Sequence, residues 1–401
     1  MPVDLTVIPG RANRLAPPSI KRWLLFLVGL TAINGVVTAM LWPATDSTHT
    51  PLFWFCFPGG AICLWLMMAS GRWLIFLASS FSADGWDHAQ EEAVSQSISR
   101  GQRSLLLLSQ VVHLPHMASA GVLSQQLLMH EGIILPSITD SATRGIIRQA
   151  RFEYEQQPLL DRLLARLRAL LLDDQLHAAF VRLGQHAPIE IAVQIGPDLT
   201  MTPEQHLVVQ QVIKETIAFP LHIAFVNGQG LECLDRWLDE PSCRQTLLVI
   251  AVNLVDKVME GAGDAAVALL IQFGGMTSTS YIASLHRPEQ TKESHGIKYA
   301  LQQALLWGGV TSDEINHIWL TGAGTGNKAE GIFSAAGMQF KKAGHPCDID
   351  ARTGLTGVAS PWLAIAATAD NVAITAAPQL LMSVPEERLS PWFMVVRCPL
   401  T

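Results

Sequence analysis

An uncharged apolar run over residues 23–42 constrains this chain of 401 residues more than any other feature. A helix rises about 1.5 Å per residue, so the run is long enough to cross the roughly 30 Å hydrocarbon core of a bilayer. Trp23 and Trp42 stand at its two ends, where amphipathic rings suit the membrane interfaces. A cleaved signal peptide is the alternative, but no small-x-small cleavage site follows the run. We therefore predict a transmembrane helix over about residues 23–42.

A second uncharged apolar segment follows after a short loop and predicts a second transmembrane helix over about residues 52–70. Gly71 and Arg72 interrupt this segment before the apolar sequence resumes. Pro58 and the two glycines after it are interpreted as the residues that membrane helices tolerate, with a kink or close helix packing as the alternative. Residues 1–81 are thus expected to form an N-terminal tail and a two-helix membrane anchor.

Basic residues set the expected orientation of this hairpin. None lies in the loop, Arg72 follows the second span, and four precede the first span: Arg11, Arg14, Lys21 and Arg22. Because Lys and Arg are enriched on the cytoplasmic side of membrane spans, both termini are expected in the cytoplasm. A charged content of only 15% agrees with an anchored chain. We expect a two-span protein of a bacterial inner membrane that contacts the lipid bilayer through this hairpin.

Charge and cysteine content exclude several other classes. The net charge is -7 and no block of Lys and Arg occurs, so nucleic acid is not an expected partner. The six cysteines form no CxxC pair and no zinc-type spacing with histidine. They predict free thiols in a reducing compartment, with no metal site and no disulfide framework. His113 and His116 flank a proline, which prevents a regular helix from presenting both to a metal.

The sequence after residue 81 alternates short apolar runs with helical patterns. Four uniformly apolar runs predict buried strands, over residues 104–112, 189–196, 246–254 and 265–273. Residues 158–183 repeat leucine at spacings of three and four and predict one long helix. Strands that alternate with helices indicate an α/β domain whose sheets are covered on both faces.

Four segments in this domain resemble, in order, motifs of the β-ketoacyl synthases. They are MEGAGDAAVALLI, KYALQQALLWGGVTSDEI, INHIWLTGAGTGNKAE and DIDARTGLTGVASPWLAIAAT. The resemblance implies a thiolase-like fold, in which two similar halves form a five-layer αβαβα domain. We place a linker and the N-terminal half at residues 82–255 and the C-terminal half at residues 256–401.

The positions that carry chemistry depart from that family's pattern. The resemblance assigns the first histidine position to Thr321, the lysine to Asp350 and the second histidine to Leu355. Ketosynthases use a cysteine at a helix N-terminus, where the helix dipole favours the thiolate. That position falls within residues 225–230, which hold no cysteine. Cys233 is a secondary candidate about one helical turn further on, and otherwise no catalytic residue is expected.

The glycine loop over residues 321–326 has a second interpretation, as a phosphate cradle at a helix N-terminus. The dinucleotide pattern is incomplete, because residue 327 is asparagine, and no Walker lysine-serine pair follows. A tight structural turn is the preferred interpretation. We expect no bound cofactor.

These observations favour a non-catalytic thiolase-like domain held at the inner membrane as an adaptor or scaffold. Protein partners are expected, a homodimer through a sheet edge is an option, and accessory work in a secretion apparatus is one setting. The alternative is a divergent acyltransferase or ketoacyl-synthase-like enzyme that uses Cys233, His286 or His295 on membrane-borne acyl chains. Binding of an acyl ligand without turnover is a third hypothesis.

Overall fold

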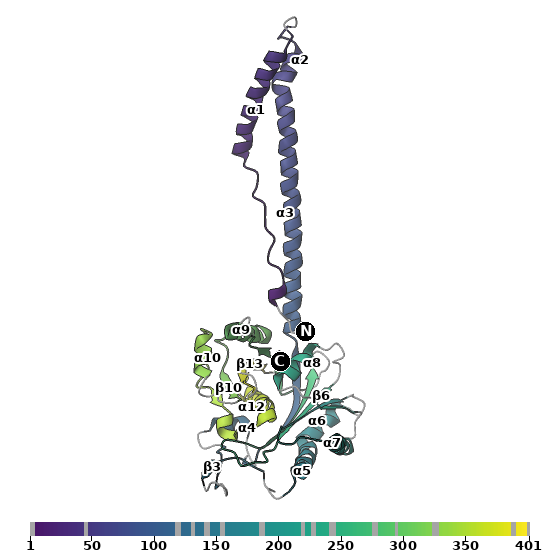
Figure 1. Cartoon of the computed structure of the whole chain (residues 1–401), viewed down its shortest axis with the longest axis vertical. Helices are drawn as coiled ribbons and strands as arrows, with labels where there is room; N and C mark the ends of the chain where they lie inside the picture. Colours follow the sequence, from purple (N-terminus) through teal and green to yellow (C-terminus); the bar gives the residue numbers. More distant parts are fainter. Residues whose placement is uncertain are drawn as a thin grey trace. The chain divides into compact units, whose positions relative to one another are not determined.

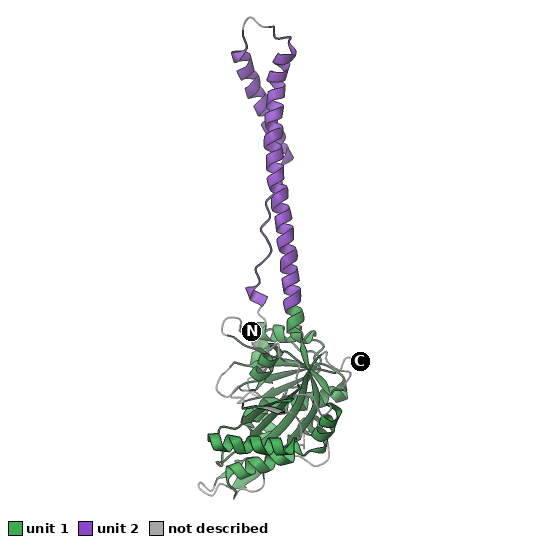
Figure 2. Cartoon of the chain, turned by 90° about the vertical axis from the view of Figure 1, so that its right-hand side faces the viewer, with its two compact units in different colours: residues 1–3, 98–401 green, residues 4–97 purple. Residues whose placement is uncertain are grey.

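The computed structural model of the chain divides into two compact units, one of residues 4–97 and one made mainly of residues 98–401 (Figure 2). The structure describes residues 5–43, 47–116, 122–129, 133–139, 145–152, 157–183, 189–217, 221–225, 230–239, 246–274, 280–292, 296–322, 329–385 and 390–398.

The smaller unit is a helical hairpin. Its helices, with the turns that begin and join them, are η1 (Leu5–Val7), α1 (Ile20–Leu41), α2 (Pro51–Trp54), the π-helical turn η2 (Phe55–Gly59) and α3 (Gly60–Gly101). Helix α1 and the continuous stretch Pro51–Gly101 are both long and apolar enough to cross a membrane. The second predicted span lies within the longer stretch, and the first ends one residue beyond α1. Helix α3 continues through Gly71, Arg72 and the sequence expected as a linker, because none of these residues removes a backbone hydrogen bond.

The residues just before Pro58 pack closely on α1, as in the alternative interpretation of this segment. Proline has no backbone N–H, and the chain forms a π-helical turn around it. The side-chain amide of Asn34 on α1 donates to the carbonyl oxygens of Cys56 and Phe57, both at 2.7 Å. Gly35 lies against the Phe57 ring, which a Cβ at residue 35 would meet at 2.5 Å. The π-helical turn therefore sets the contact between α1 and the second helical stretch.

The extended N-terminal segment is tied to α3 by exposed ion pairs. Arg14 contacts Asp84 and Asp87, both at 2.8 Å, and Arg11 contacts Glu91 at 3.1 Å. The guanidinium of Arg14 lowers the pKa of the Asp87 carboxyl through a hydrogen bond. Two of the four basic residues before the first span are thus already paired with carboxylates.

The larger unit contains the same five-strand arrangement twice. The first set is β1 (Ser104–His113), β4 (Ile189–Ile195), β5 (Leu221–Phe225), β6 (Thr246–Asn253) and β7 (Ala265–Phe273). The second is β8 (Ala283–His286), β10 (His317–Thr321), β11 (Cys347–Asp348), β12 (Gln379–Ser383) and β13 (Trp392–Arg397). The orders β5-β4-β6-β7-β1 and β11-β10-β12-β13-β8 match strand for strand, and β1 pairs with β8 to join them.

Strand directions repeat as well. In each set the last strand along the chain, β7 or β13, is antiparallel to both of its neighbours, whereas the other pairs within the set are parallel. The two halves of the domain therefore share one topology.

Three hydrophobic cores hold five layers together: one lies on the outer face of each sheet, and the central one surrounds the helices between the sheets (Figure 1). Helices α5 (Leu159–Leu171), α6 (Asp174–Leu183) and α7 (Pro203–Thr216) cover the first sheet, α9 (Gly296–Gly308) and α10 (Ala329–Ala335) cover the second, and α8 (Leu231–Asp239) and α12 (Ser360–Thr375) lie between the sheets. Strand β6 contributes to two cores, because successive side chains of a strand point to opposite faces: Val249 faces the central core and Ile250 the outer one. Near-uniform apolar strands are what a sheet covered on both faces requires.

Shorter elements complete the described structure. They are α4 (Leu123–Leu128), β2 (Ser137–Thr139), β3 (Ile146–Arg148), β9 (Glu289–Gln290), α11 (Asp350–Thr353) and η3 (Gly357–Ala359). Helix α4 packs on α12 in the central layer, where the α12 carboxylate of Asp370 accepts from the Gln110 side chain at 2.9 Å.

The four predicted strands are confirmed, but two boundaries differ from expectation. The helix predicted over residues 158–183 is broken after Leu171, where the Asp173 carboxylate accepts from the backbone N–H of Gln175 and starts α6. The expected division of the domain after residue 255 is also displaced. Strand β7 completes the first sheet, so the second half begins after Phe273.

Candidate functional site

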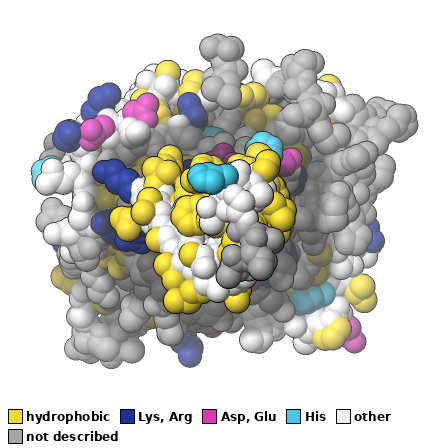
Figure 3. Space-filling model, turned by 90° about the horizontal axis from the view of Figure 1, so that it is seen from above, with side chains coloured by type: hydrophobic (Ala, Val, Ile, Leu, Met, Phe, Trp, Pro, Cys, Tyr) yellow, Lys and Arg dark blue, Asp and Glu magenta, His cyan; other side chains and the backbone are white. Residues whose placement is uncertain are grey.

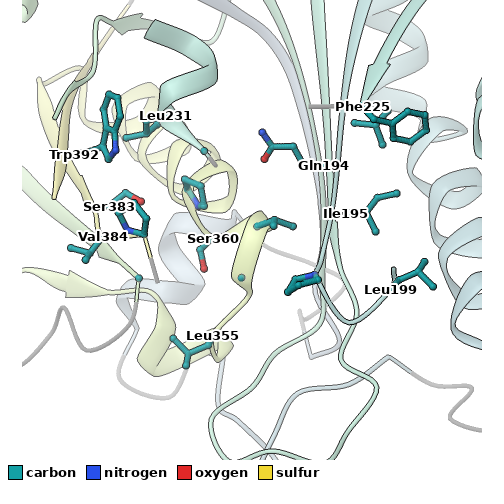
Figure 4. Close-up of a pocket in the computed structure, with 18 of the residues that line it drawn as sticks. Gln194, Ile195, Leu199, Phe225, Leu231, Leu355, Ser360, Ser383, Val384 and Trp392 are labelled. Atoms are coloured by element: carbon teal, nitrogen blue, oxygen red, sulfur yellow. The ribbon is translucent and has the colours of Figure 1, made fainter. Parts of the chain in front are cut away.

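A cavity of about 380 Å³ lies where the two halves meet. It opens at the carboxyl ends of parallel strands from both sheets and at the N-termini of the two central helices (Figure 4). Its lining includes Gln194, Ile195, Leu199, His206, Phe225, Gly230, Leu231, Gly322, Leu355, Ser360, Pro361, Ser383, Val384 and Trp392. Ligand sites of α/β proteins form at such strand ends.

Gly230 occupies the end of the segment in which the nucleophile was expected. It directly precedes α8, lines the cavity and has a φ of 62°, in the left-handed region that favours glycine. A Cβ at this position would lie 2.6 Å from Cγ of Pro361, the second residue of α12. The proline ring therefore fills the space that a side chain at residue 230 needs. Residues 226–229 lie outside the described residues.

Cys233 does not reach the cavity. It is the third residue of α8, and its backbone N–H donates to the carbonyl oxygen of Gly230 at 3.2 Å. Its side chain is half-buried and packs against the central core. It is not among the residues that line the cavity.

The three positions assigned by resemblance do converge on this site. Leu355 lines the cavity as an apolar side chain. Thr321, the last residue of β10, is fully buried, and its hydroxyl donates to Oδ1 of Asp350 at 3.2 Å. The cavity wall next to it is Gly322, which has a φ of 104° and lies against the carbonyl of Val384. The structure thus brings the three positions together, but their side chains differ from the histidine, lysine and histidine of the family that the sequence resembles.

Asp350 organises the second half of the cavity wall. Its carboxylate accepts from the backbone N–H of Gly322, from the Thr321 hydroxyl and from the Ser360 hydroxyl, the last at 3.4 Å. Burial raises the pKa of Asp350 to about 7, while these hydrogen bonds act in the opposite direction. The nearby carboxylate of Asp348 adds to the rise of this pKa.

Replacing Asp350 by Asn is expected to flatten part of the pH dependence of stability. The unfolded carboxyl has a pKa near 4 and the folded one about 7, so the folded chain binds more protons between these values. The free energy of unfolding therefore falls as pH rises from about 4 to about 7, and the Asp350→Asn variant lacks this fall. Thermal unfolding at about pH 5 and about pH 8 measures it, and the variant should gain on the parent chain at the higher pH.

The control for this measurement is Asp313→Asn, because Asp313 forms an exposed pair with Lys341. It should shift the unfolding midpoint equally at both pH values. An equal shift for Asp350→Asn as well would contradict the role given to its carboxyl.

Sequence reasoning missed the polar groups from the first half of the domain. Gln194 on β4 accepts from the indole N–H of Trp362 at 2.7 Å, so the two halves are linked beside the cavity. His206 on α7 lies against Phe225 with ring centroids 4.3 Å apart. Gln194 could have been found by inspecting the carboxyl end of the strand predicted over residues 189–196, whereas His206 lies within helix α7 and gave no such signal. The contact of Pro361 with Gly230 could not be predicted from a local pattern, because the two residues are far apart in the sequence.

The described residues provide little evidence for a metal site or for the histidines considered as alternative catalytic groups. Within it, no group of three His, Cys, Asp or Glu side chains is placed to hold a metal ion. His113 and His286 are half-buried, and burial lowers the pKa of both, that of His286 to about 4. His295 lies outside the described residues, as does most of the glycine loop, residues 323–328.

Comparison with known proteins agrees with the duplicated topology. No protein-family model and no curated protein sequence matches the chain. The ishigamide ketosynthase/chain length factor aligns over 74% of this chain and 99% of its own, with a TM-score of 0.53 and 12% identity. A ketosynthase in complex with its chain length factor from Xenorhabdus doucetiae gives a TM-score of 0.46 at 13% identity, over 74% and 98% of the chains.

A further similar structure is 3-oxoacyl-[acyl-carrier-protein] synthase III from Aquifex aeolicus, with a TM-score of 0.45 and 11% identity over 73% of this chain and 99% of that one. The first similarity and the repeated strand order define the class. The chain has the thiolase-like fold of the ketosynthases, and an N-terminal helical hairpin precedes it.

Proposed function

We propose that this chain is a non-catalytic, membrane-anchored thiolase-like protein that acts as an adaptor or scaffold at the cytoplasmic face of a bacterial inner membrane. Gly230 carries the proposal, because the last position of the segment expected to hold the nucleophile is a glycine whose side-chain space is filled by Pro361. Neither histidine position carries an imidazole. Residue 321 is a threonine whose hydroxyl donates to Asp350, and residue 355 is an apolar leucine.

The membrane anchor is supported by the exposure of its apolar side chains. Only 6% of the apolar window in each hairpin helix is buried in protein, and side chains such as Leu25 and Met40 are about four-fifths exposed, at 76% and 81%. Figure 3, which looks onto the hairpin end, shows apolar side chains gathered there. Each square ångström of such surface is unfavourable in water by about 25 cal/mol. A bilayer provides the medium that this surface requires.

An anchored domain without a nucleophile acts by binding. The partner we propose is a protein, with accessory work in a membrane-attached secretion apparatus as one setting. Strand β5 ends the order of the first sheet and, among the described strands, pairs only with β4. That free edge is the surface we propose for a homodimer.

Binding of an acyl ligand without turnover is the second candidate function. The lining of the cavity favours it, because it includes the apolar side chains of Ile195, Leu199, Leu355 and Val384. In this case the cavity would hold a chain and release it unchanged.

Purification of the tagged full chain from its native host tests the adaptor role. We expect one protein partner in near-stoichiometric amount. The partner should also bind the larger unit alone, after the hairpin, residues 4–97, is removed. Bound small molecules are analysed from the same sample. Recovery of an acyl thioester or acyl-carrier protein as the sole companion would contradict the adaptor role and support the second candidate.

A further inference from the structure

Helix α3 is covered along one face. The indole N–H of Trp65 on α3 donates to the carbonyl oxygen of Trp23 on α1 at 2.8 Å, and the extended N-terminal segment continues along the same side of α3 (Figure 1). Ala83, only 5% exposed, follows Trp65 by about five helical turns, so both residues lie on this face. Asp87, one turn further, contacts Arg14 of the extended segment. We call this side the covered face of α3.

An apolar stripe runs along the opposite face of α3. Its members alternate in spacing between four and three residues, which places them on one line of a helix, and they are Met67, Gly71, Leu74, Ala78, Phe81 and Gly85. Phe81 and Gly85 each stand two residues from Ala83, about 200° around the helix from it. The three large side chains are 66–71% exposed, and a Cβ at either glycine would meet no atom within 4 Å. The stripe is an apolar heptad pattern, which is typical of a coiled coil.

The apolar sequence that contains this stripe is longer than a bilayer core. From residue 51 to residue 81 Arg72 is the single charged residue, and a helix of this length rises by about 45 Å. The hydrocarbon core is about 30 Å thick, and the average tilt of about 20° shortens the helix only to about 42 Å. Leu52 and Phe81, near the two ends, are 64% and 71% exposed. Lipid hydrocarbon cannot surround both ends, so part of this surface needs a protein to cover it.

A second copy of this chain fits the stripe. Insertion in one membrane gives every copy the same orientation and depth, so two α3 helices meet parallel and in register. Large residues of the stripe then face large ones and small residues face small ones, and the stripe carries no charge that would repel its copy. Arg72 precedes Ala83 by about three helical turns and is half-buried, so it lies on the covered face, away from the second helix.

The contact is large enough for a stable dimer. Five large apolar side chains on the stripe or beside it are at least 40% exposed, namely Met67, Leu74, Ile75, Leu77 and Phe81. Burial of such a side chain removes about 100 Å² from its surroundings, so two copies together bury about 1,000 Å². Specific protein interfaces begin at about this area.

We propose that two copies of this chain pair through a parallel coiled coil of α3 over residues 67–85. The proposal rests on the membrane anchor of the proposed function, and it gives the homodimer a surface other than the β5 edge. Pairing makes the anchored protein bivalent, which raises its apparent affinity for a partner that offers two binding sites.

Native mass spectrometry of full-length variants extracted from vesicles tests the pairing. The parent chain should be a dimer. Leu74→Gln/Phe81→Gln should weaken association at least about a hundredfold, because each copy loses two apolar contacts at the interface. The matched control Leu66→Gln/Trp73→Gln changes two side chains of neighbouring turns that are 53% and 44% exposed but lie outside the stripe, and it should stay dimeric.

Disulfide formation in the vesicles tests the register. Ala78→Cys, in a chain with Cys56 and Cys63 replaced by serine, should form an intermolecular disulfide. Facing residues of a parallel in-register pair bring their Cα atoms within the roughly 4.4–6.8 Å that a disulfide requires. The control Ser79→Cys lies one turn before Ala83 on the covered face and should stay monomeric under the same oxidation.

A monomeric parent chain, or equal dissociation of both glutamine variants, would overturn the coiled coil. A dimer that survives Leu74→Gln/Phe81→Gln would place the contact elsewhere, such as the β5 edge, and would overturn it as well. Flotation with vesicles is measured in parallel. A parent chain that fails to float would overturn the anchor and this pairing together, whereas a monomer that floats would overturn the pairing alone.

Discussion

Replacing Asp264 by Ala is expected to lower the free energy of unfolding of the thiolase-like domain by about 3–5 kcal/mol. Asp264 is fully buried next to Arg162, with Nη2 of the arginine 3.0 Å from the carboxylate. The same carboxylate accepts from the backbone N–H groups of Val255 and Phe152 at 2.7 and 3.0 Å. The substitution leaves a buried guanidinium and two backbone donors without their acceptor.

Denaturant unfolding followed by tryptophan fluorescence measures this effect. The control is Asp313→Ala, which removes an exposed pair with Lys341 and should cost less than about 1 kcal/mol. A loss for Asp264→Ala no larger than the control's would show that the buried pair does not hold the domain together.

Placing a cysteine at residue 230 is expected to destabilise the domain by about 2–4 kcal/mol. The new side chain must adopt a φ of 62° and displace Pro361, whose ring lies 2.6 Å from the Cβ position. The double variant Gly230→Cys/Pro361→Ala should recover more than about 1 kcal/mol relative to the sum of the single changes. The same unfolding measurement applies.

Gly261→Cys is the matched control for this cycle. Gly261 has a φ of 74°, and a Cβ there would meet no atom within 4 Å, so the variant isolates the backbone effect of about 1 kcal/mol. If Gly230→Cys proves no worse than this control, Pro361 does not exclude a side chain at residue 230.

Strand positions could be predicted from the sequence because fully buried strands such as β6 and β7 have uniformly apolar runs. Their neighbours could not, since pairing such as β1 with β8 joins residues far apart in the chain. That is why the expected division after residue 255 separated β7 from its own sheet. Local chemistry explains the other miss, because Asp173 ends one helical pattern and starts another within a continuous leucine repeat.

At the candidate site too, positions within a motif could be predicted from the sequence, whereas contacts between distant segments could not. Motif order drew attention to Leu355, which lines the cavity, and to Thr321, which precedes the cavity-lining Gly322. The contact between Gly230 and Pro361 depends on two helices from different halves of the domain, so no local sequence pattern predicts it. In the hairpin, Asn34 and Pro58 are each unremarkable in sequence, and their relation through the π-helical turn depends on the register of two helices.

Intact-protein mass spectrometry after incubation with excess acyl thioester tests the absence of catalysis most directly. The account predicts that the full chain keeps its unmodified mass, because Gly230 has no nucleophile and Cys233 packs into the central core away from the cavity. The Cys233→Ser variant should be indistinguishable. An acyl adduct on the parent chain that maps to Cys233 and disappears in this variant would contradict the account and establish a divergent acyl-transfer enzyme.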